Sequence, residues 1–123
     1  MTGCAWLDQS EHERIIGDYE VGWNDLVQNR NISKSIKGYS GCYDILVNGY
    51  VYGVGHNDEY IIAKRLFGVD KTTYFYIIDI KKNEKYGGEN GVYSSLNKNE
   101  FDSLRLKLNI ANISFDKNYP LNP

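Results

Sequence analysis

Short runs of alternating apolar and polar residues recur along most of this chain, with glycine- and asparagine-rich turns between them. The runs are rich in Tyr, Ile and Val, which fit a pleated, half-buried strand. Because strands this short follow one another through tight turns, the pattern favours an antiparallel meander. The runs predict strands at residues 19–23, 31–36, 43–47, 50–54, 59–65 and 73–80.

The clearest hairpin signal is Asn48-Gly49, which lies between two of these runs. An Asn-Gly pair suits the two-residue turn that joins antiparallel strands. A second hairpin is expected at the next turn, with Gly55 opposite Asp58. Both faces of the sheet then carry apolar side chains, so each face needs a cover. A helix can cover the side on which Gly53 and Gly55 leave room, and the first strands or a curled sheet must cover the other.

A C-terminal helix over residues 98–108 is the most clearly marked single element. Asn97 and Glu100 have the spacing of a capping box, in which each side chain binds a backbone amide of the other. Phe101 and Leu104 then fall on one apolar face of the helix. The sequence therefore predicts an α+β fold, in which an antiparallel meander sheet of about five to seven strands has one C-terminal helix packed on it.

The length of 123 residues predicts one domain with short ends. Residues 1–17 are expected to form a polar N-terminal tether, because they contain little that a core could bury. Residues 18–116 are expected to form the single domain of sheet plus helix. Residues 117–123 contain both prolines of the chain and are expected to be a frayed tail.

The charge balance disfavours nucleic acid as a partner. The chain has 14 basic and 16 acidic residues and no basic stripe, whereas nucleic-acid binding depends on concentrated positive charge. No apolar run approaches the roughly 20 residues of a membrane span. Contact with a membrane is therefore expected only through a lipid anchor, and no cofactor is expected.

Thr2-Gly3-Cys4 resembles the end of a bacterial lipoprotein signal, in which the cysteine is lipidated and becomes the mature N-terminus. A complete signal also needs a positive stretch and an apolar run before the cysteine, and three residues precede Cys4 here. We expect Cys4 to be a lipid anchor, and the protein then lies in the bacterial cell envelope or periplasm. The alternatives are a disulfide between Cys4 and Cys42 in an oxidising compartment and a cytoplasmic location.

His56, Asp58 and Glu59 bring an imidazole and two carboxylates close together in the sequence. Structural zinc sites take four ligands, and catalytic ones take three plus water. Strand alternation sends Asp58 and Glu59 to opposite faces, so a polar hairpin turn is the favoured interpretation. No catalytic residue and no metal ligand is assigned from the sequence.

Three segments resemble a family of small, uncharacterised bacterial envelope lipoproteins that contain a domain of unknown function. They read GHNDEYIIAK at residues 55–64, YIID at 76–79 and NEFDSLR at 99–105. The resemblance covers about residues 18–116, and it departs from the family at 91–96, where the family often has Gly-Pro-Leu. It implies an envelope location and a strand–strand–helix arrangement, and it transfers no active-site residue.

Eleven tyrosines and two tryptophans are the compositional excess of the chain. Tyr and Trp favour strands, but they also supply rigid contact area at binding surfaces. We therefore expect a non-enzymatic binding module that contacts another protein, and a specific version is an immunity protein that blocks a toxin. The alternatives are an enzyme or metal-binding protein with a site near His56, Asp58 and Glu59, and a structural subunit of an envelope assembly. The oligomeric state stays open. The expected partner-binding residues are Trp23, Tyr50, Tyr52, His56, Asp58 and Glu59.

Overall fold

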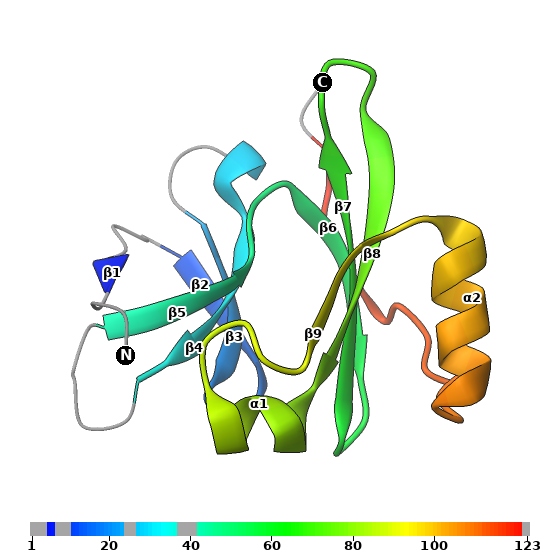
Figure 1. The fold of residues 1–123 in the computed structure, drawn as a ribbon. Coiled ribbons are helices and arrows are strands. Elements are labelled where there is room, and N and C mark those ends of the chain that lie inside the picture. The colour runs from blue at the N-terminus through cyan, green and yellow to red at the C-terminus, as the bar shows by residue number, and fades with distance from the viewer. Residues whose placement is uncertain (1–4, 7–10, 24–26, 37–41, 122–123) are drawn as a thin grey trace.

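Two antiparallel sheets stacked face to face form the body of the protein, and a helix covers the outer face of one of them (Figure 1). The computed structural model describes residues 5–6, 11–23, 27–36 and 42–121. Within this part of the chain, each sheet contains five strands.

The N-terminal half of the chain forms the first sheet, with the strand order β1-β5-β4-β3-β2. A tight turn at Gly17, whose φ is +58°, joins the two strands at one edge of the sheet. A 3₁₀ helix, η1 (Val27–Asn29), precedes the fourth strand. The strands are β1 (Ala5–Trp6), β2 (Glu11–Ile16), β3 (Tyr19–Trp23), β4 (Asn31–Ser35) and β5 (Cys42–Val47).

The C-terminal half forms the second sheet, with the order β10-β6-β7-β8-β9, and two helices. Helix α1 (Ile80–Tyr86) follows β8 directly, and α2 (Lys98–Lys107) follows β9. The strands are β6 (Val51–His56), β7 (Tyr60–Phe67), β8 (Thr72–Asp79), β9 (Val92–Leu96) and β10 (Lys117–Asn118).

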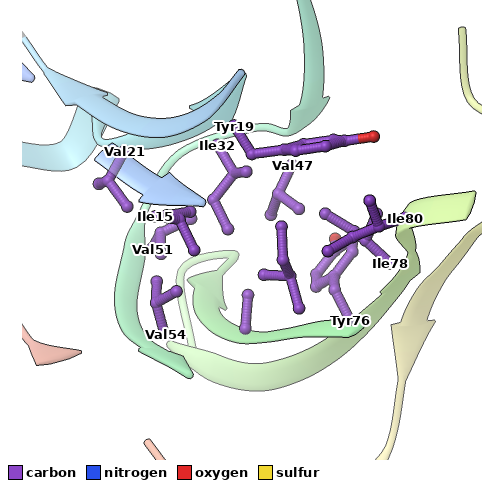
Figure 2. Packing of buried hydrophobic residues seen from close by; sticks show 12 residues of the cluster. Ile15, Tyr19, Val21, Ile32, Val47, Val51, Val54, Tyr76, Ile78 and Ile80 are labelled. Atoms are coloured by element: carbon purple, nitrogen blue, oxygen red, sulfur yellow. The ribbon is translucent and has the colours of Figure 1, made fainter. Parts of the chain in front are cut away.

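The main core lies between the two sheets (Figure 2). At one end of this core, the Tyr19 hydroxyl donates a buried 2.7 Å hydrogen bond to Oδ1 of Asn83 in α1, so the short helix closes the sandwich. Burial raises the pKa of the Tyr19 phenol, which therefore keeps its proton. The buried core residues are Ile15, Tyr19, Val21, Ile32 and Val47 from the first sheet, and Val51, Val54, Ile61, Ala63, Tyr76, Ile78 and Ile80 from the second half.

A second core lies between the outer face of the second sheet and α2. The ring of Phe101 stacks on Phe75, with the ring centres 4.5 Å apart. The expected capping box is confirmed, because Asn97 and Glu100 each accept a hydrogen bond from the other's backbone amide. Helix α2 lies on the face of the sheet that was expected from the glycines, but it packs on β8 and β9. The room at Gly55 is taken by the chain after α2, because an added Cβ would strike the carbonyl oxygen of Ser114.

The prediction of antiparallel sheet combined with helix is confirmed. The prediction of one meander sheet with one C-terminal helix is wrong, because the described strands form two sheets and two α-helices are present among them. Asn48-Gly49 does not form a hairpin, because β5 and β6 belong to different sheets. An added Cβ on Gly49 would lie 2.6 Å from the carbonyl oxygen of Gln28 and 2.7 Å from that of Arg30. Glycine is therefore needed here because the connection crosses between the sheets against η1.

The predicted pairing of the β6–β7 hairpin is also wrong, by several residues. Gly55 pairs with Ile62 instead of Asp58. The Asn57 side chain accepts hydrogen bonds from the amides of Glu59 and Tyr60, which holds the chain in a wider turn. Asparagine side chains stabilise such turns by replacing a backbone acceptor.

The ordered structure extends beyond residues 18–116 at both ends. Glu11–Ile16, within the expected tether, forms β2, which pairs with β3 and buries Ile15. Lys117–Asn118, within the expected tail, forms β10 and pairs with β6. Strand pairing satisfies the backbone of these polar segments, and their weak hydrophobicity concealed them in the sequence.

We expect Gly55→Ala to destabilise the protein by about 1–3 kcal/mol, because the new methyl group would displace the backbone at Ser114. Gly53→Ala on the same strand is the matched control. Its Cβ would meet the flexible Lys64 side chain, and its unfolding free energy should stay within about 1 kcal/mol of the wild type. Urea unfolding measures the free energy of unfolding of both variants. An equal loss of stability in the two variants would contradict the close approach of Ser114 to Gly55.

Candidate functional site

The hairpin of β7 and β8 projects past the strands on either side of it (Figure 1). The two strands pair as far as Phe67 and Thr72, whereas β6 pairs with β7 only up to Arg65. Phe67 is 58% exposed and Val69 is fully exposed. An apolar tip on a projecting hairpin is unusual for a surface that meets only water.

Tyr50 and Tyr52 brace the base of this hairpin. The carbonyl of Tyr50 accepts a hydrogen bond from the Leu66 amide, and the Tyr52 hydroxyl shares a 2.7 Å hydrogen bond with the Thr73 hydroxyl. Nζ of Lys64 lies 5.0 Å from the centre of the Tyr52 ring. Both tyrosines are half-buried, so they fix the hairpin and still show part of their rings to solvent.

Arg30 is a buried arginine beside these tyrosines, with only 2% of its surface exposed. Its guanidinium donates to the carbonyl of Val51 at 2.7 Å and to that of Pro120 at 3.3 Å. It lies 4.7 Å from the ring centre of Tyr119 and 5.7 Å from that of Trp23. Burial lowers the pKa of Arg30, but a guanidinium stays charged in proteins. Backbone carbonyls and ring faces thus stabilise the charge.

Tyr119 links this arginine to the surface. Its hydroxyl donates a short hydrogen bond to Glu13 in β2, and Lys117 forms a 3.5 Å ion pair with the same carboxylate. The hydrogen bond from Tyr119, followed by the charge of Lys117, lowers the pKa of Glu13. The Trp23 ring meets the Tyr119 ring edge-on at 5.8 Å. We call the hairpin tip, Tyr50, Tyr52, Trp23 and Tyr119 together the hairpin end.

A cavity of about 230 Å³ lies on the inner side of the projecting hairpin and is lined by Arg65, Phe67, Tyr74, Tyr76 and Ser95. The Arg65 guanidinium lies 4.7 Å from the centre of the Phe67 ring and donates to the Tyr76 hydroxyl at 3.0 Å. The Phe67 and Tyr74 rings meet edge-on at 6.2 Å. The cavity therefore combines a fixed positive charge with aromatic walls.

The six expected partner-binding residues separate into two groups at opposite ends of β6. Trp23, Tyr50 and Tyr52 gather at the hairpin end, and all three are half-buried. His56, Asp58 and Glu59 lie at or beyond the other end of β6, in the turn toward β7.

This second group makes local polar contacts. Nδ1 of His56 lies 3.1 Å from the carbonyl oxygen of Asn57, and Glu59 forms a 3.2 Å ion pair with Lys81 of α1. Asp58 is exposed. Among the described residues, no three His, Cys, Asp or Glu side chains are grouped so that they could hold a metal ion.

Sequence reasoning missed Arg30, Tyr119 and the Arg65 cavity. A signal for the cavity was present, because alternation along β7 places Arg65 and Phe67 on the same face as the core residues Ile61 and Ala63. No local signal could join Arg30 to Tyr119, since they are far apart in the chain and meet only when the two sheets stack.

Cys42 is buried and disulfide-bonded. The other cysteine of the chain, Cys4, was expected to carry lipid, and it lies outside the described residues. No helix in the described segments has the length and apolar character that crossing a bilayer requires.

The interaction of Tyr119 with Glu13 predicts a pH-dependent contribution to stability. The pKa of Glu13 is lowered in the folded state, so the stabilisation is present above the ordinary carboxyl pKa and is lost as the pH falls through the lowered value. Tyr119→Phe should cost about 0.5–1 kcal/mol at pH 7. Its difference from the wild type should shrink as the pH falls from about 5.5 toward 3.

Tyr52→Phe is the control for this experiment. It removes a hydrogen bond between two neutral hydroxyls, so its difference from the wild type should not change with pH in this range. Urea unfolding at a series of pH values measures both variants. A Tyr119→Phe difference that stays constant down to pH 3 would show that Glu13 does not contribute in this way.

Comparison with known proteins gives one match. The family described as "Protein of unknown function (DUF3997)" matches residues 16–119, a range that contains the hairpin end and the Arg65 cavity. No curated protein and no solved structure matches the chain. The expected relation to an uncharacterised family is confirmed, and the chain belongs to this family of proteins of unknown function.

Proposed function

We propose that this protein is a non-enzymatic binding module of the bacterial cell envelope that recognises another protein through the hairpin end. The observation that carries the proposal is the exposed apolar tip of the β7–β8 hairpin, where Phe67 and Val69 face solvent. Exposed apolar side chains grouped on one projection, with polar surroundings, mark interaction sites on soluble domains.

The base of the hairpin supports this role because it is rigid. Tyr50 and Tyr52 hold the two strands by hydrogen bonds, and Arg30 ties the start of β6 to the C-terminal segment. A surface that is already ordered loses less conformational entropy when it binds. The side chains that it partly exposes, Trp23, Tyr50 and Tyr52, are also of the types that contribute most at protein interfaces.

A specific version of the proposal is an immunity protein that occludes a toxin. Blocking a partner needs a rigid, complementary surface and no chemistry, which agrees with a site built from aromatic side chains and held by hydrogen bonds. His56, Asp58 and Glu59 lie outside the hairpin end. A partner that also contacts them must therefore extend along the length of β6.

The envelope part of the proposal is supported by the disulfide of Cys42. Disulfides persist in oxidising compartments and are rare in the cytoplasm. A lipid on the sulfur of Cys4 and a disulfide that uses the same sulfur exclude each other. The envelope location is compatible with either, so the two need a direct test.

Site-specific crosslinking tests the binding surface. We expect a photo-crosslinking residue in place of Phe67 or Val69 to capture one defined partner protein in cells. The matched control position is Leu106 on α2, which is 72% exposed but lies away from the hairpin end. Capture of the same partner from Leu106 and not from the tip would place the interface elsewhere. Absence of a partner from all three positions would contradict the proposed function.

Thiol labelling and mass spectrometry test the state of the cysteines. We expect denatured protein isolated from the envelope without reductant to show no reactive thiol, because Cys42 is disulfide-bonded. Cys42→Ser should then release one labelled thiol at Cys4. A lipid mass on the N-terminal peptide would instead establish the anchor at Cys4 and contradict a disulfide that uses it.

A further inference from the structure

The cavity beside the hairpin tip holds Arg65, whose charge is not neutralised by any carboxylate in the part of the chain that the structure describes. None of the ion pairs among the described residues involves Arg65. Its interactions are with aromatic rings and with the hydroxyl of Tyr76. Its Nε is buried, and no described residue accepts a hydrogen bond from it. The charge of Arg65 is therefore stabilised by few acceptors within the fold, and a ligand that accepts from its terminal N–H groups would add to them.

The surroundings hold this guanidinium in one orientation. The Phe67 ring lies 4.7 Å from its centre on one side, and the Tyr76 ring lies 5.9 Å away. The Tyr76 hydroxyl, which accepts from Arg65, also lies within hydrogen-bond distance of Ser95 Oγ at 3.3 Å. An arginine fixed on aromatic faces presents its remaining N–H groups as a planar fork, and that fork matches both oxygens of a carboxylate.

Ser95 completes the cavity through an unusual backbone conformation. Its φ is +55°, and the pairing of β8 with β9 shifts register beside it. A residue other than glycine in this region is strained, and such residues are concentrated at ligand-binding sites. Ser95 lines the cavity together with Arg65, and an irregularity of this kind in strand pairing can redirect a side chain toward a site.

The ligand that fits this cavity carries one negative charge on an apolar stem. One arginine balances a single carboxylate, whereas a phosphate group of nearly two charges needs further cationic or amide donors, and the lining contains no second cation. The volume of about 230 Å³ is larger than the roughly 150 Å³ that admits a benzene ring. The aromatic walls can therefore hold the stem while Arg65 binds the charge.

We propose that the Arg65 cavity receives an aspartate or glutamate side chain of the partner protein. This inference rests on the proposed function, because the cavity adjoins the tip and shares Phe67 with it. It makes the carboxylate the charged contact of the interface, with Phe67 and Val69 as the apolar contacts around it.

Peptide binding to the intact protein tests this directly. The probes are acetyl-Phe-Glu-Phe-amide, its Gln counterpart and benzoate, each titrated into isotope-labelled protein while the Nε–Hε resonance of Arg65 is followed by NMR. We expect a saturable shift with the Glu peptide and binding weaker by about tenfold or more with the Gln peptide. Equal binding of the two peptides would overturn the proposal. Benzoate binding more tightly than the Glu peptide would assign the cavity to a small carboxylate instead of a protein.

Two arginine variants provide the controls. Arg65→Gln should weaken binding of the Glu peptide by about tenfold or more and leave binding of the Gln peptide unchanged. Arg14→Gln removes an exposed arginine from β2 in the other sheet and should change neither. Backbone NMR spectra show whether each variant is folded. If Arg65→Gln does not fold, Arg65→Lys keeps the charge but loses the planar fork, and full retention of Glu-peptide binding there would contradict recognition by the fork.

The peptide experiment does not use the partner, so its failure is separate from failure of the proposed function. Crosslinking from the tip without Glu-peptide binding would keep the protein interface and overturn the carboxylate contact. Glu-peptide binding without crosslinking would keep the carboxylate site and overturn the proposed protein partner.

Discussion

The sheet formed by β6, β7 and β8 carries apolar side chains on both faces, and the rest of the molecule is arranged to remove both faces from water. Successive residues show this, because Ile61 belongs to the core against the first sheet and Ile62 to the core against α2. The same holds for Ile78 and Ile77 on β8. A strand buried on both sides requires two covering layers. The N-terminal strands supply one layer, and α2 with the chain after it supplies the other.

The covering layers end before the strands do, and the hairpin tip with Phe67 and Val69 is left exposed. Beyond Arg65 on β7 no neighbouring β6 residue continues the pairing, although β7 and β8 continue to pair as far as Phe67. The exposed apolar tip is therefore a consequence of strands that are longer than the layers on them. Its rigidity comes from hydrogen bonds at its base, above all those of Tyr50 and Tyr52. Such a site arises from the length of two strands of the sheet, without an additional loop or element inserted into the fold.

Local patterns predicted most strands, the capped helix and the need to cover two faces, because each of these depends on neighbouring residues. The partition into two sheets was not predictable from Asn48-Gly49, since the same pair suits a hairpin and a crossing between sheets. The polar strands β2 and β10 were not predicted, because strand pairing stabilises them and their sequences lack an apolar periodicity. Of the site, Trp23 and the two tyrosines were found through their residue types. Arg30 was missed, since its partners Val51 and Pro120 approach it only in the folded chain.

Arg30 and Arg65, which lie near the hairpin end, differ in role, because Arg30 is structural and Arg65 is a candidate site. Both lie against aromatic rings, and neither has a carboxylate among the described ion pairs. Arg30 is 2% exposed and donates to two backbone carbonyls, so its charge is stabilised by the fold itself and no ligand can reach it. Arg65 donates to one hydroxyl and lines a cavity of about 230 Å³. The Arg65 guanidinium therefore has N–H groups that can donate to an anion from outside the chain. It also lies beside an apolar tip, which can contact the rest of the same partner.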